Sequence, residues 1–261
     1  MGDTPEPRRR KGRLHEEKLA KSPPTRGSDN DIKYFGNAAV DIIAVHGLAS
    51  AYETTWSVPL EKDSEQRYHW LREKLGVDIP QARILGFEYG SEWYGEPSYT
   101  NLGDCGTELL RCILRDRRHV GRPEICPTQK RRPIIFIAHS FGGLVVKQAI
   151  AAAYRRWKAG DDPGSAVKES VRRAETANHR DFLCSVAGII FLGTPHQGST
   201  FSAWANLKMA VGSLMGQETH EELVKVLAAN SQPLARLQAD FRDACGDSSV
   251  LDLQLCCYRE T

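Results

Sequence analysis

The segment that most constrains the fold is a short apolar run that leads into a serine and two glycines. Residues 133–139 (P-I-I-F-I-A-H) precede Ser140, and Gly142 and Gly143 follow it one residue later. A wholly apolar run bounded by proline predicts a buried parallel strand. Beyond the glycines, apolar residues recur at helical spacing, at positions 144, 145, 149, 150, 153, 154 and 157. Ser140 is therefore expected on a sharp turn between a strand and a helix.

A serine displayed on such a turn is a candidate nucleophile. The turn is strained and brings the strand and helix backbones close together, so it needs small neighbours. Gly142 and Gly143 supply them on one side. Ala138 stands where the G-x-S-x-G pattern of nucleophile elbows has its first glycine. A purely structural serine is the alternative interpretation.

Strand and helix patterns alternate along the chain from Ile32 onward. Further strands are predicted at 40–45, 82–89, 186–192 and 250–258, and helices at 67–75, at 102–114 and within 201–245. The polar stretch 158–181 is interpreted as an extended surface excursion. Such alternation predicts an α/β fold with a doubly wound, mostly parallel sheet.

The loop after the strand at 40–45 is a candidate oxyanion site. In parallel sheets of this kind, functional residues gather at the carboxyl ends of the strands. The backbone N–H groups of Leu48 and Phe141 are the predicted oxyanion donors, and Gly47 would let the chain approach closely. An ordinary strand-to-helix turn is the alternative. We expect His46 to brace this loop rather than to act as a base.

The remaining members of a catalytic triad are harder to place. With a serine on this turn the chain order is serine, then acid, then histidine. Glu260, at the end of the last predicted strand, is the candidate acid, and Asp252 and Asp247 are weaker candidates. None of the eight histidines follows Glu260, and His196 stands at a suitable strand end but precedes the acid. We therefore expect a domain that is C-terminally truncated and lacks its last strand and its base; a protein that works without a triad is the alternative.

Composition and charge restrict the classes of partner. The formal net charge is only +2, and residues 1–31 carry that excess, with eight Lys or Arg against six Asp or Glu. This balance gives no reason to expect a nucleic-acid partner. No apolar run approaches the roughly 18 residues that span a bilayer. Residues 1–31 lack apolar periodicity and are predicted to be a disordered, basic, Pro-rich tail before a folded domain at 32–261.

The cysteine pattern and the motif search indicate no metal or organic cofactor. The seven cysteines are scattered without a C-x-x-C pair, which is typical of free thiols in a reducing compartment. Cys256 and Cys257, adjacent in the last predicted strand, are expected to pack in the core. The sequence has no H-E-x-x-H, no cysteine–histidine cluster and no G-x-G-x-x-G after a strand.

Four motifs in order carry a family resemblance. They are V-D-I-I-A-V-H-G-L-A-S from Val40, A-R-I-L-G-F-E-Y-G from Ala82, R-P-I-I-F-I-A-H-S-F-G-G-L-V-V-K-Q-A from Arg132 and G-I-I-F-L-G-T-P-H-Q-G-S from Gly188. Over residues 38–261 the chain resembles the lipase-like serine esterases, a family of α/β-hydrolases related to the serine-active-site-containing protein. Similar domains stand at the N-terminus of many fungal NACHT and ankyrin-repeat proteins.

This resemblance implies an α/β-hydrolase fold with Ser140 as the nucleophile and an ester or lipid as the substrate. A cytoplasmic location is the default, and the resemblance also allows peripheral association with mitochondrial or endoplasmic-reticulum membranes. Two functions remain open on the sequence. The first is a serine esterase or lipase that cleaves carboxylic esters through an acyl-enzyme. The second is a catalytically incomplete signalling or interaction module that keeps the scaffold and precedes NACHT or repeat domains.

Overall fold

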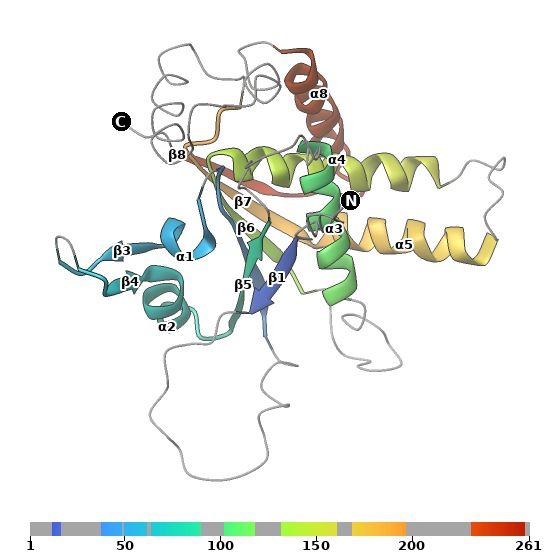
Figure 1. The fold of residues 1–261 in the computed structure, drawn as a ribbon. Helices are drawn as coiled ribbons and strands as arrows, with labels where there is room; N and C mark the ends of the chain where they lie inside the picture. The colour runs from blue at the N-terminus through green and yellow to red at the C-terminus, as the bar shows by residue number, and fades with distance from the viewer. Residues whose placement is uncertain are drawn as a thin grey trace, which may run out of the picture.

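The computed structural model has a six-stranded central sheet with the strand order β1-β5-β2-β6-β7-β8 (Figure 1). It describes residues 12–16, 38–48, 50–61, 64–89, 102–117, 132–160, 169–196 and 231–258, with no side chains for 169–172. The strands are β1 (Arg13–Glu16), β2 (Val40–Val45), β5 (Ala82–Glu88), β6 (Ile134–His139), β7 (Val186–Leu192) and β8 (Gln254–Tyr258). Within this sheet, β1 pairs antiparallel with β5, and the other four pairings are parallel.

The chain reverses its direction of travel across the sheet at β2. β5 pairs with one side of β2, and helix α3 (Leu102–Asp116) then leads to β6 on the other side. At the carboxyl end of β2, Val45 stands opposite both Phe87 and Ala138. The carboxyl ends of β2 and β6 therefore adjoin at a topological switch point, where open α/β sheets bind their ligands.

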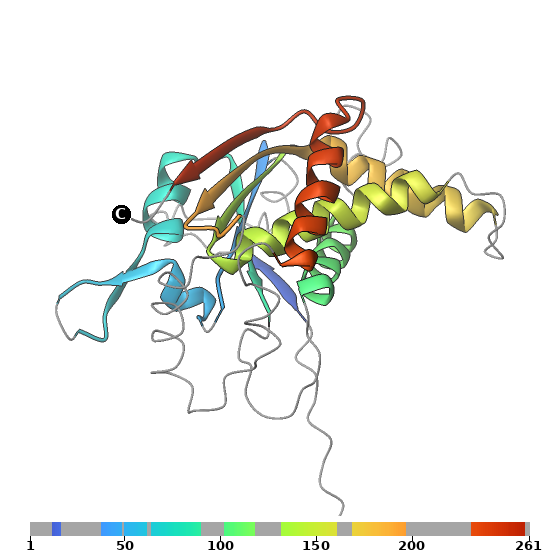
Figure 2. The ribbon, with the colours of Figure 1, turned by 90° about the horizontal axis from the view of Figure 1, so that it is seen from above.

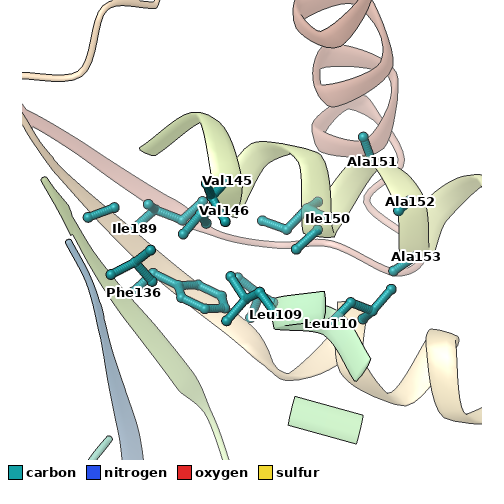
Figure 3. Close-up of a cluster of buried hydrophobic side chains, with 14 of the residues drawn as sticks. Leu109, Leu110, Phe136, Val145, Val146, Ile150, Ala151, Ala152, Ala153 and Ile189 are labelled. Carbon is teal, nitrogen blue, oxygen red and sulfur yellow. The ribbon is translucent and has the colours of Figure 1, made fainter. Parts of the chain in front are cut away.

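Four helices cover one face of the sheet: α3, α4 (Phe141–Ala159), α5 (Glu169–Ser185) and α8 (Gln232–Gly246). Figure 3 shows Leu109 of α3 and Ile150 of α4 meeting Phe136 and Ile189 of the sheet. α3 and α4 approach closely at Gly106, where any side chain would collide with Gln148. Burying an apolar side chain of the size of Leu109 or Ile150 stabilises the fold by about 1.5–3 kcal/mol.

The opposite face is covered by smaller elements (Figure 2). They are α1 (Tyr52–Thr55), the hairpin of β3 (Ser57–Pro59) and β4 (Arg67–His69), the π-helix η2 (Leu71–Leu75) and α2 (Gly76–Asp78). Tyr52, Trp56 and Leu71 pack here against Ile42 and Ile137, which the alternation of strand side chains directs to this side. The structure has helices on both sides of a mostly parallel sheet, as predicted.

Four local predictions need correction. The predicted helix 67–75 is a strand up to His69 followed by a π-helix. The predicted excursion 158–181 contains most of helix α5. The exposed side of this helix is strongly charged, and its other side, which includes Phe182 and Leu183, packs on the core. Cys256 and Cys257 are exposed, because β8 is the edge strand of the sheet.

The fourth correction concerns the predicted disordered tail. Residues 13–16 form β1, and His15 packs edge-on against Tyr52 with 4.6 Å between ring centroids. Gly12 fits against Phe87 and Glu108 so closely that a side chain there would overlap them. The tail prediction is therefore wrong for this segment, and the rest of residues 1–31 lies outside the described residues.

A buried ion cluster lies at the amino end of the sheet. The Asp41 carboxylate is fully buried and binds the guanidinium groups of Arg83 and Arg132, each at 2.9 Å, and that of Arg117. Arg83 also reaches Asp116 at 2.7 Å. The Arg117 guanidinium donates in addition to the backbone oxygen of Arg132 at 2.5 Å. The cluster joins β2, β5, the end of α3 and the start of β6.

Candidate active site

Ser140 occupies the turn between β6 and α4 with a strained backbone. Its φ is 49° and its ψ is −122°, and among the described residues it is the one residue other than glycine with a positive φ. Such a conformation costs about 1–3 kcal/mol and persists only where the surroundings enforce it. Here the backbone N–H of Ser140 donates to the backbone oxygen of Leu192 at 2.8 Å. The backbone oxygen of Ser140 accepts from the Gly143 N–H at 3.1 Å. The half-buried side chain stands at the N-terminus of α4, where the helix dipole favours developing negative charge.

Two glycines allow α4 to begin directly against the neighbouring chain segments. A methyl group at Gly142 would overlap the backbone oxygens of Val45 and His46. A methyl group at Gly143 would overlap the side chain of Thr194. The first turn of α4 is thus held between the end of β2 and the turn that follows β7. This is the close approach for which the sequence analysis expected small residues.

The loop after β2 lies beside Ser140. A methyl group on Gly47 would be 3.1 Å from the Ser140 Cβ, so the two backbones come close there. Leu48 and Phe141, the predicted oxyanion donors, are both buried. Within the described part of the chain, neither of their backbone N–H groups donates to another residue. The predicted donors are therefore close to Ser140 in the fold, and their role in binding an oxyanion stays a prediction.

A buried histidine and a tyrosine brace this loop. The His46 ring stacks on Tyr89 with 4.5 Å between centroids, and its Nδ1 hydrogen-bonds the oxygen of Gly47 at 2.9 Å. The Tyr89 hydroxyl donates to the oxygen of His46 at 2.9 Å. Burial lowers the pKa of His46 to about 4, so its ring is neutral near pH 7. His46 thus braces the loop, as expected from sequence; Tyr89 was not predicted, and its one signal is its position at the end of an apolar strand.

His196 stands at the carboxyl end of the sheet, in the turn after β7. Burial, with the Lys147 ammonium as a second cause, lowers its pKa to about 4. Its ring packs edge-on against Phe191 at 4.7 Å, and its Nε2 is 3.7 Å from the Cys257 Sγ. A triad histidine needs a carboxylate to orient it, whereas the charged group that acts on His196 among the described residues is a cation.

The candidate acids differ in their placement. Glu260 lies outside the described residues, but Tyr258, two residues before it, accepts a hydrogen bond from the Gly193 N–H at 2.9 Å. The end of β8 therefore lies beside the turn after β7. Asp247 binds Tyr154 and Lys158 at the far end of α4, each at 3.1 Å. Asp252 is exposed and precedes β8, at the opposite end of that strand from Tyr258. Asp247 and Asp252 therefore lie away from the edge of the sheet that carries Ser140, whereas Tyr258 lies at that edge.

Within the described ranges, no group of three His, Cys, Asp or Glu side chains could hold a metal ion.

Comparison with known proteins assigns the chain to a family. Residues 42–229 match the family model described as "Putative serine esterase (DUF676)". The chain belongs to this family. Among curated proteins, the chain is similar to Protein SERAC1 of Homo sapiens, with 26% identity over 225 residues. Protein SERAC1 of Bos taurus is 25% identical over 223 residues. Each match covers 80% of this chain and 29% of the relative, so the chain spans less than a third of these relatives' length.

Solved structures with a similar arrangement are more distant. The lipase BlEst2 of Bacillus licheniformis in its mature form gives a TM-score of 0.45 at 17% identity, covering 93% of this chain and 70% of the lipase chain. The poly(3-hydroxybutyrate) depolymerase LpqC of Bordetella parapertussis gives 0.37 at 13% identity, covering 86% and 75%. The esterase family membership and the strand order identify the fold as that of the α/β-hydrolases. No helix in the described ranges combines the length and the apolar character that crossing a membrane requires.

Proposed function

We propose that this chain is a serine hydrolase domain that cleaves carboxylic esters through an acyl-enzyme at Ser140. The observation that carries the proposal is the positive φ of Ser140 on the strand-to-helix turn. Strain of this kind is kept where a hydroxyl must be displayed rather than packed. Family membership supports the same reaction class.

In the proposed reaction the Ser140 Oγ attacks the ester carbonyl carbon while a base takes its proton. The carbonyl oxygen becomes an oxyanion, which the N–H groups of Leu48 and Phe141 bind. The protonated base then gives its proton to the leaving oxygen, and collapse of the intermediate expels the alcohol and leaves an acyl-enzyme, which water hydrolyses to the acid and free Ser140. The proposed acid that orients the base is Glu260, and the proposed base is a histidine.

The test is covalent labelling of the full-length protein with a fluorophosphonate probe. Such a probe reacts with an activated serine, so the wild type should be labelled at Ser140, and Ser140→Ala should not be labelled. Ser249→Ala is the matched control, because Ser249 is an exposed serine bonded to Asp247 at the far end of α4. Its labelling should equal that of the wild type. Labelling that persists in Ser140→Ala rejects the proposed nucleophile.

A second measurement separates ester cleavage from labelling alone. Short-chain p-nitrophenyl esters should be turned over by the wild type and not by Ser140→Ala. A chain that is folded, as judged by circular dichroism, but neither labelled nor active would support the interaction-module alternative.

A further inference from the structure

Lys147 is a buried lysine that the proposed reaction does not use. It lies on α4 two turns after Ser140, and its side chain is 3% exposed. Nearby positions of α4 such as Val146, Ile150 and Ala151 are buried and apolar. An ammonium group is costly to bury unless partners surround it, and a methionine of similar length would fit such a site more cheaply. Packing therefore does not account for a lysine here.

The partners of Lys147 connect it to the turn after β7. Its Nζ donates to the Oε1 of Gln238 on α8 at 3.0 Å. The Nε2 of Gln238 in turn donates to the backbone oxygen of His196. The ammonium also lies over two aromatic rings, at 5.5 Å from the centroid of Phe191 and 5.2 Å from that of Phe241. The lysine is thus held on several sides. It contacts Phe191 of β7 directly, and through Gln238 it is connected to the backbone of the 193–196 turn.

The 193–196 turn lies beside the start of α4, next to Ser140. Leu192, immediately before the turn, accepts the Ser140 N–H, and Thr194 fills the space beside Gly143. Gly143 is four residues before Lys147, so both lie on the same face of α4. One face of this helix therefore contacts the turn twice, directly at Thr194 and through Gln238 at His196.

We propose that Lys147 is a positioning residue, which acts through Gln238 to fix the 193–196 turn against the first turn of α4 and so to hold Ser140 in its reactive geometry. This inference rests on the proposed function of Ser140. The protonated form of Lys147 is the one that acts, because it donates the stronger hydrogen bond and is attracted to both rings.

The surroundings of Lys147 place its titration within an accessible pH range. Burial lowers its pKa to about 8, and the thiols of Cys257 on β8 and Cys245 on α8 oppose this shift. Among the described residues His196 also interacts with Lys147; its pKa is about 4, so it stays neutral above pH 6. Above about pH 8 the lysine therefore loses its charge, and the turn should loosen.

The experiment measures the rate of fluorophosphonate labelling at Ser140 between pH 6.5 and 9.5 on the whole chain. Lys147→Met keeps the stem and removes the charge, and should slow labelling at pH 7 by roughly ten- to a hundredfold, the range expected for a small displacement of reacting groups. Lys147→Arg should restore most of the rate and abolish the loss above pH 8, because arginine does not titrate there. Lys158→Met, an exposed lysine on the same helix, is the matched control and should behave like the wild type.

Hydrogen exchange supplies a readout that does not depend on activity. In Lys147→Met, and in Gln238→Glu, which keeps the acceptor for Lys147 but loses the donor to His196, the amides of residues 193–196 should exchange faster. Unchanged exchange together with a labelling rate within twofold of the wild type in Lys147→Met overturns the proposal, as does an equal loss in Lys158→Met. A wild type that is not labelled at Ser140 rejects the proposed function instead, and the exchange data then decide alone whether Lys147 fixes the turn.

Discussion

Gly47 lies against Ser140 with so little room that a methyl group on Gly47 would be 3.1 Å from the Ser140 Cβ and 3.2 Å from the His139 Nδ1. This contact is tighter than most, so a side chain must push the loop and the serine apart. Gly47→Val should reduce fluorophosphonate labelling by about 10²–10³, the loss typical of a removed oxyanion donor. Gly246→Ala is the control, because a methyl group at Gly246 meets no atom within 4 Å. Equal labelling of Gly47→Val and the wild type would exclude this loop from the site.

The contact between Gly143 and Thr194 can be tested by a double-mutant cycle. Gly143→Ala places a methyl group into the Thr194 side chain and should lower both stability and labelling. Thr194→Ala removes the Oγ1 and Cγ2 atoms that cause most of this overlap, so it should partly restore both in the double variant. Residues in contact typically couple by about 0.5–3 kcal/mol in unfolding free energy. Additive effects in denaturant unfolding would contradict the contact.

Asp41 should be the most sensitive charged position in the fold. Asp41→Asn leaves three buried or nearly buried guanidinium groups without their shared carboxylate. Removing one partner of a buried ion cluster typically costs about 3–5 kcal/mol of unfolding free energy. Asp78→Asn, which breaks the exposed pair with Lys74, should cost less than about 1 kcal/mol. Urea unfolding of both variants measures the difference, and equal losses would contradict a structural role for the cluster.

The pH dependence of stability should reveal His46. Its pKa is about 4 in the folded protein and about 6.5 in an unfolded chain. The unfolded state therefore binds more protons between these values, and stability is lost as the pH falls from about 6.5 to about 4. The loss from this group is at most about 3 kcal/mol, from 1.36 kcal/mol per pH unit. His46→Gln should flatten this part of the curve in urea unfolding; an unchanged slope would show that other groups cause it.

β1 should contribute to stability and solubility. It covers the edge of β5, and Leu14 packs on the main core. Deleting residues 1–16 should lower the unfolding free energy and expose the edge of β5, which favours association between chains. Light scattering after size exclusion would detect the association. Deleting residues 1–11 alone is the control, because it leaves β1 in place.

Runs of apolar residues in the sequence predict most strands of the sheet. The strands at 40–45 and 186–192 were found with the correct bounds, because parallel strands buried on both faces read as continuous apolar runs. β1 was missed because it has four residues, two of them charged, and its pairing with β5 is set by tertiary contact. α5 was missed because its exposed face is strongly charged. β1 and α5 form because of the segments they pack against, and a local sequence pattern carries no information about those distant segments.

The candidate site was predictable where it depends on backbone geometry. Ser140 and its glycines carry a local signal, since a strained turn admits few residues. Lys147 and Gln238 carry none, and Tyr89 only its position at a strand end, because each acts through a partner more than 40 residues away along the chain. Lys147 would be interpreted from sequence alone as an ordinary exposed lysine.

The cluster around Asp41 has a consequence for how this part of the chain can vary. Arg117 and Arg132 approach the same carboxylate from the two ends of the segment between them, and Arg117 also binds the backbone oxygen of Arg132. The ends of that segment are therefore fastened together independently of its length. Because lengthening the chain between two fixed points costs only about 0.6 kcal/mol per doubling, a peptide or reporter inserted between positions 117 and 132 should leave the Asp41 cluster and Ser140 undisturbed.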